Sequence, residues 1–127
     1  MAALIQMHNN VAGVKVLLLA PKYRLGRGDE NDVVIDDDLI SREHAVIERL
    51  SVAGADDNAH FMIRDLDSTN GTFVNHKQIK EALLNEGDLI RLGQTFFQFS
   101  LKEKGKPGDT KVLKKTIIPG VYYTTDK

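Results

Sequence analysis

The sequence predicts an all-β fold, a sandwich or barrel built from short strands. Two observations lead to this prediction. Short apolar or alternating runs recur at intervals of about 8–12 residues, and clusters of Gly, Pro, Asn and Asp separate them. No window of useful length repeats its apolar residues with the helical period of about 3.6 residues. The chain has 127 residues and no cysteine, so we expect one domain whose core forms without disulfides.

Four runs in the first third of the chain are predicted to be strands. The first alternates between its two faces, the second is apolar enough to be largely buried, and the other two are short and β-rich. Turn residues end them: the pair Asn9-Asn10, Pro21, Gly26 and the acidic run Asp36–Asp38. The four runs are Met1–Met7, Val14–Leu19, Tyr23–Leu25 and Val33–Ile35.

Five further strands are predicted before residue 102. Periodicity alone leaves Ala45–Leu50 open between helix and strand, and its β-branched Val46 and Ile47 favour a strand. The pair Gly93-Gln94 separates the last two runs and predicts a hairpin. The five runs are Ala45–Leu50, His60–Leu66, Thr72–Val74, Asp88–Leu92 and Thr95–Leu101.

The residues from Lys104 onward lack a face that could be buried. They are rich in Lys and Thr, and Ile117-Ile118 is their one apolar patch of note. We therefore expect a domain over residues 1–103 and a flexible linker and tail over residues 104–127. The tail has six lysines and two aspartates, a net charge of +4, so a chain total of −1 leaves −5 on the rest.

Charge and hydropathy argue against several classes of function. General nucleic-acid binding needs positive potential over a wide surface, which an acidic domain lacks. The apolar run Val16–Ala20 is too short to cross a bilayer, and no basic segment precedes it as in a signal peptide. The absence of cysteine is compatible with a reducing compartment, so we expect a cytoplasmic protein. The four histidines lack metal-site spacing, and we expect no metal or cofactor.

Three polar loops carry the candidate functional side chains. The first, Leu25–Asp32, holds Arg27 between two glycines, and a guanidinium can bind phosphate with two parallel hydrogen bonds. The second is Ser41–His44, and the third is Asp67–Asn75 with its hydroxyls and the carboxamide of Asn70. If the loops converge, a cation, hydroxyls and an amide can bind one anion.

Each loop taken alone has a plainer interpretation. Arg27 could pair with a neighbouring carboxylate, and Asn70-Gly71 could form a tight hairpin turn. Ser41 and His44 suggest a hydrolase or phosphatase, but the local sequence shows no nucleophile elbow. We therefore expect a binding protein with no catalytic residues, and keep the enzyme as an alternative.

The order and spacing of these motifs resemble the forkhead-associated (FHA) domain family. Gly26-Arg27 is followed, fourteen residues after Arg27, by Ser41-Arg42-x-His44, then by the Asp67–Asn75 motif and by Gly87–Gly93. The resemblance covers about residues 3–101. It implies an eleven-stranded β-sandwich with strands of mixed pairing, whose loops at one end bind phosphothreonine peptides.

The resemblance also implies a role for each matching residue. The residues implied to hold the phosphate are Arg27, Ser41, Arg42 and Thr69. Asn70 would bind the peptide backbone, and the residues implied to support the loops are Gly26, His44 and Gly71. From its side-chain chemistry, Asn75 could also support its loop or reach a second peptide group. The family's preference for phosphothreonine over phosphoserine implies a niche for one methyl group, whose burial contributes about 0.8 kcal/mol.

We therefore expect a non-catalytic adaptor that binds phosphothreonine-containing proteins in Ser/Thr kinase signalling, with neither nucleic acid nor membrane insertion. The alternative is a phosphate-independent interaction or oligomerisation module that uses another face of the sandwich. The tail suggests a further possibility: a phosphorylated threonine there could occupy the pocket of its own or another copy, whereas an unmodified tail would not. The tail threonines are Thr110, Thr116, Thr124 and Thr125.

Overall fold

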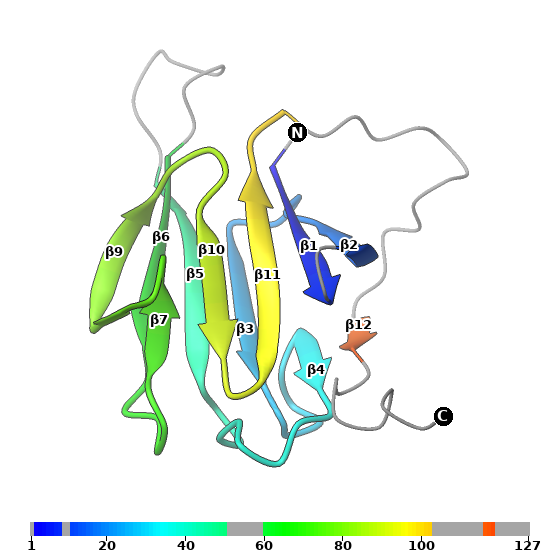
Figure 1. The fold of residues 1–127 in the computed structure, drawn as a ribbon, viewed down its shortest axis with the longest axis vertical. Coiled ribbons are helices and arrows are strands. Elements are labelled where there is room, and N and C mark those ends of the chain that lie inside the picture. Colours follow the sequence, from blue (N-terminus) through cyan, green and yellow to red (C-terminus); the bar gives the residue numbers. More distant parts are fainter. Residues whose placement is uncertain (1, 9–10, 51–59, 103–115, 119–127) are drawn as a thin grey trace.

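The protein is an all-β sandwich of two six-stranded sheets, as the sequence predicts (Figure 1). The computed structural model describes residues 2–8, 11–50, 60–102 and 116–118, and these residues form twelve strands and no helix. No stretch within these ranges is therefore a helix that could cross a membrane. The strands are β1 Ala3–His8, β2 Val11–Leu17, β3 Lys22–Gly26, β4 Val33–Ile35, β5 Ala45–Leu50, β6 His60–Asp65, β7 Thr72–Val74, β8 Lys77–Ile79, β9 Glu81–Leu84, β10 Leu89–Leu92, β11 Thr95–Ser100 and β12 Thr116–Ile118.

The two sheets differ in how their strands pair. The first has the order β2-β1-β11-β10-β7-β8 and is antiparallel throughout. The second has the order β12-β4-β3-β5-β6-β9, and β4 runs parallel to both of its neighbours. This is the mixed pairing that the family resemblance implies.

Alternation along the strands builds the core between the sheets. In β11, Thr95, Phe97 and Phe99 are buried while Gln98 is exposed. Phe61 of β6 meets Phe99 edge to face with ring centroids 5.6 Å apart, so the two sheets pack through aromatic contacts. Side chains at every second position thus bind the two layers together.

The strand register brings the three polar loops to one end of the sandwich, the lower end in Figure 1. Leu25, near the end of β3, is paired with Ala45, at the start of β5. Ala45 is paired in turn with Asp65, at the end of β6. Leu25, Ala45 and Asp65 thus form one row across three neighbouring strands. The loops that follow β3, precede β5 and follow β6 all meet the sheet near this row.

Three strands were not predicted. β8 and β9 are short edge strands whose sequences, Lys-Gln-Ile and Glu-Ala-Leu-Leu, have mostly exposed side chains and little β-propensity. The third, β12, lies in the expected tail, where Thr116 to Ile118 pair with Val33 to Ile35 of β4. The expectation of a tail without regular structure is therefore wrong for these three residues, because β4 offers an edge to which they can add. The other tail threonines lie outside the described residues.

Asn70-Gly71 does not form the tight hairpin turn that an Asn-Gly pair suggests. β6 and β7 belong to different sheets, so Asn70-Gly71 lies in a crossing between layers and not in a hairpin. The hairpin predicted at Gly93-Gln94 does form, between the paired residues Leu92 and Thr95. A second two-residue turn is Asn75-His76, between the paired residues Val74 and Lys77. Both turn residues have positive φ, 51° and 71°, as the common two-residue hairpin turn requires.

Candidate functional site

The first two loops are joined by backbone hydrogen bonds. The amide of Arg27 donates to the carbonyl of Ser41 at 3.0 Å, and the amide of Gly28 donates to the carbonyl of Arg42 at 3.1 Å. These bonds lie beyond the paired ends of β3 and β5. They place two of the predicted phosphate-binding residues, Arg27 and Ser41, side by side.

This close approach explains Gly26 and reveals a residue that the sequence interpretation missed. A Cβ atom on Gly26 would lie 2.3 Å from the carbonyl oxygen of Arg42 and 2.7 Å from Nδ2 of Asn31. The buried Asn31 amide donates to the carbonyls of Gly28 and Arg42, so it ties the first loop to the second. In the sequence Asn31 follows an acidic pair and looks like an ordinary turn residue. Only the fold reveals that its side chain joins the two loops.

His44 connects the second loop to the third. The ring is fully buried, its Nδ1 accepts the amide proton of Ser41 at 3.0 Å, and its Nε2 lies 2.8 Å from the carbonyl oxygen of Gly71. The proton therefore sits on Nε2, which donates to Gly71. Because both ring nitrogens are occupied by backbone groups, His44 does not take the proton of the Ser41 hydroxyl as a catalytic base would.

Two side-chain bonds place the third loop against the second. The amide of Thr69 donates to Oγ of Ser41 at 2.9 Å, and Nδ2 of Asn70 donates to the carbonyl of Leu39 at 2.9 Å. Ser41 still has its hydroxyl proton to donate, and Asn70 keeps its side-chain oxygen as an acceptor. Since the Thr69 amide is already used, only the hydroxyl of Thr69 remains for a ligand.

A second missed residue, Asp65, organises the third loop from the end of β6. Its carboxylate accepts hydrogen bonds from the amide and hydroxyl of Ser68 and from the hydroxyl of Thr72. Oγ of Ser68 in turn accepts the amide proton of Gly71, whose φ of 88° favours glycine. Gly71 thus takes part in the hydrogen bonds that shape the third loop, in a backbone conformation that favours glycine.

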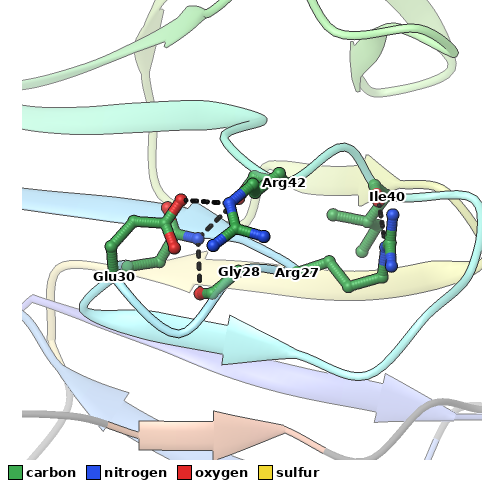
Figure 2. Close-up of polar contacts among 6 residues, drawn as sticks. Arg27, Gly28, Glu30, Ile40 and Arg42 are labelled. Carbon is green, nitrogen blue, oxygen red and sulfur yellow. Dashed lines mark hydrogen bonds and ion pairs between the residues drawn. The ribbon is translucent and has the colours of Figure 1, made fainter.

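Both arginines expose their guanidinium groups and are held through Nε (Figure 2). Nε of Arg27 donates to the carbonyl of Ile40 at 3.0 Å. Nε of Arg42 donates to the carboxylate of Glu30 at 3.0 Å. In both arginines the bond is made by Nε, so the terminal nitrogens of the guanidinium remain for a ligand.

Asn75 lies apart from the other predicted site residues. It follows β7, whereas Gly71 precedes that strand. Its side chain donates to the carboxylate of Asp88 and accepts the amide proton of Leu89. Asn75 therefore fastens the β7–β8 turn to the start of β10, and both polar atoms of its side-chain amide are used there.

The buried position of His44 affects its ionisation. Burial lowers the pKa of His44, although the hydrogen bond to Gly71 and the charges of Asp65 and Asp37 oppose this shift. Burial also tends to raise the pKa of Asp65, but hydrogen bonds from Ser68 and Thr72 outweigh it and keep that pKa below its usual range. Near neutral pH the site therefore holds a neutral imidazole beside a carboxylate.

We expect the protein to lose stability as the pH falls below about 6.5, the ordinary pKa of histidine. The unfolded chain takes up the His44 proton first, because the folded pKa is lowered, so acid favours unfolding in this range. Protonated Nδ1 can also no longer accept the Ser41 amide proton. Urea denaturation at pH 7.5 and pH 5.5 measures the effect, and a His44→Gln variant should show a smaller difference between the two pH values. An equal difference in the variant would assign the effect to other groups.

Comparison with known proteins identifies relatives over most of the chain. The FHA domain family matches residues 23–93, a range that contains all the predicted site residues. EmbR, a transcriptional regulatory protein of Mycobacterium tuberculosis, is 37% identical over 100 residues, which are 78% of this chain and 24% of EmbR. The chain thus spans about a quarter of that relative's length.

Solved structures share the sandwich. Mycobacterium tuberculosis EmbR in complex with a low affinity phosphopeptide matches with a TM-score of 0.66 and 32% identity, over 82% of this chain and 26% of that one. The Slr1951 protein from Synechocystis sp. matches with a TM-score of 0.70 and 30% identity, over 81% of this chain and all of that one. A structure from a study of phosphothreonine-dependent FHA domain interactions matches with a TM-score of 0.65 and 26% identity, over 80% and 99% of the two chains.

Proposed function

This chain belongs to the FHA domain family, and on that premise we propose that its loop end binds phosphothreonine peptides as an adaptor in Ser/Thr kinase signalling. The observation that carries the proposal is the hydrogen-bond network that joins three loops around Arg27 and Ser41. EmbR, which shares the fold, has been seen with a phosphopeptide. The proposal concerns this chain and not the functions of longer relatives.

The donors that remain free suit a phosphate. Arg27 offers its terminal nitrogens, Ser41 its hydroxyl proton and Thr69 its hydroxyl, while Arg42 adds a second guanidinium from the neighbouring loop. Charge-assisted hydrogen bonds to phosphate are stronger than neutral ones, each contributing roughly 1.5–3 kcal/mol. Because the loops are fixed to one another before a ligand arrives, binding costs little ordering of the protein.

Asn70 is placed to hold the peptide on one side of the phosphate. Its carbonyl oxygen can accept a backbone N–H of an extended peptide while its Nδ2 stays on Leu39. The same residue would thus fix the loop and the ligand. Substituting Asn70 by Ala should weaken binding of the phosphorylated peptide without changing its dependence on the phosphate.

We further propose that the site performs no chemistry. His44 has both ring nitrogens bonded to backbone groups, and Oγ of Ser41 is bonded to the Thr69 amide and not to His44. A nucleophilic serine needs a base within hydrogen-bond reach of its hydroxyl. The arrangement therefore suits recognition of a phosphate that remains on its peptide.

A titration with one peptide in three forms tests the proposal. The phosphothreonine form should bind, the unphosphorylated form should not, and the phosphoserine form should bind about fourfold more weakly if the threonine methyl is buried. Equal affinity for phosphothreonine and phosphoserine would remove only the methyl niche. Binding that persists after phosphatase treatment would contradict the proposal and favour an interaction module that uses another face.

A further inference from the structure

The two arginines of the site differ in what holds them. Nε of Arg27 is bonded to a neutral backbone carbonyl, that of Ile40. Nε of Arg42 is bonded to a carboxylate, that of Glu30, at 3.0 Å. Figure 2 shows Glu30 and Arg42 facing each other from neighbouring loops.

This difference changes the charge that the free site presents. Of the described residues, no carboxylate lies within salt-bridge distance of Arg27. Arg42 already has a counter-ion, so the two guanidinium groups and Glu30 together carry a net charge of +1. The charge available to an incoming phosphate is therefore smaller than two arginines suggest.

Glu30 also lies close to the predicted phosphate site. A Cβ atom on Gly28 would lie 2.5 Å from Oε1 of Glu30 and 2.6 Å from Cγ of Arg42. Both side chains therefore pack over the backbone of Gly28, the residue next to Arg27. A phosphate bound between Arg27 and Arg42 would lie near this carboxylate.

We propose that Glu30 is a built-in competing anion, which occupies Arg42 in the free protein and lowers the affinity for phosphopeptides. The inference rests on the proposed function, because it concerns the same site. A phosphate that engages Arg42 either replaces Glu30 or stays beside its negative charge, and both cases oppose binding. Arg42 therefore contributes less to binding than Arg27, although both carry the same charge.

The opposite role for Glu30 would be to orient Arg42 for the ligand. The exposure of the pair argues against it: the side chain of Arg42 is 76% exposed and that of Glu30 is 36% exposed. Exposed ion pairs hold their geometry weakly. Glu30 and the bound phosphate repel each other at close range whether or not Glu30 still contacts Arg42. The competing role therefore predicts tighter binding when the charge of Glu30 is removed.

The experiment compares the affinities of Glu30→Gln and wild type for phosphothreonine peptides. It uses first a pool of peptides with random residues on both sides of the phosphothreonine, and then the peptide of that pool that binds most tightly. Glu30→Gln should bind about threefold to tenfold more tightly at low salt, and the gain should shrink at high salt as the repulsion is screened. Glu48→Gln is the matched control, since Glu48 pairs with Arg64 at 3.0 Å on β5 and β6, outside the three loops. It removes the same charge and should leave the affinity within about twofold.

A double-mutant cycle adds the second readout. Arg42→Ala should weaken binding several-fold more in the Glu30→Gln background than in the wild-type background, because only there is Arg42 free of its counter-ion. If Glu30→Gln binds equally or more weakly while wild type still prefers the phosphorylated pool, the inference about Glu30 is overturned and the proposed function stands. No preference of wild type for the phosphorylated pool would overturn the proposed function as well.

Discussion

Replacing Arg27 with alanine should weaken phosphothreonine peptide binding by about 3 kcal/mol or more, roughly 100-fold or greater, and leave the fold intact. Arg27 is exposed, and among the described residues its Nε bond to the Ile40 carbonyl is the one side-chain hydrogen bond that the substitution removes. The loss in unfolding free energy should therefore stay at about 1 kcal/mol or less. Fluorescence anisotropy measures the affinity and urea denaturation the stability.

Arg24→Ala is the matched control for this substitution. Arg24 is an exposed residue of β3, three positions before Arg27, and it is paired with Val46 of β5. Removing its charge should change the affinity by about twofold or less, because salt screens exposed charges at this range. If the two variants bound equally well, the guanidinium of Arg27 would not be the phosphate-binding group.

Replacing Gly26 with alanine should destabilise the protein by about 1–3 kcal/mol, the range for forcing an extra carbon into a packed region. The new Cβ would lie 2.3 Å from the Arg42 carbonyl oxygen, and a backbone group cannot move aside as the end of a side chain can. The backbone would therefore have to shift, and this shift would separate the first two loops. We therefore expect weaker phosphopeptide binding even at temperatures where the variant is folded.

Gly13→Ala separates this effect from the general consequences of replacing glycine. A Cβ on Gly13 would lie 3.1 Å from Oε1 of Gln6, a side-chain atom and not a backbone atom, in an exposed position of β2. This variant should differ from wild type by about 0.5 kcal/mol or less in unfolding free energy and bind normally. Thermal unfolding followed by circular dichroism compares the two variants, and equal stability would mean that the loops can part without cost.

The strand pattern and the three loop motifs were predictable because they rest on local chemistry. Turn residues and alternating apolar side chains mark β3, β5 and β6, whose register then brings the loops together. The family resemblance implied structural roles for Gly26 and His44, and both lie at contacts between the loops. A guanidinium between glycines likewise has few roles other than surface pairing or anion binding.

What could not be predicted depends on tertiary contacts. Asn31 looks like an ordinary turn residue in the sequence, and its bond to the Arg42 carbonyl joins two loops that only the fold brings together. Asp65 lies in the predicted strand His60–Leu66, and nothing in the strand pattern shows that its carboxylate binds Ser68 and Thr72 of the following loop and strand. The pairing of Glu30 with Arg42 was missed for the same reason, since twelve positions separate them in the chain. β12 forms on an edge that β4 provides, and a sequence pattern does not show which edges are open.

In the proposed site, three loops act together on one phosphate. A titration of the isotope-labelled chain with a phosphothreonine peptide, followed by amide chemical shifts, tests it most directly. If the loops act together, the largest shifts should occur at Gly28, Ser41 and Asn70, all following one binding curve that is absent with the unphosphorylated peptide. Shifts confined to one of these loops, or centred on the outer face of a sheet, would contradict it.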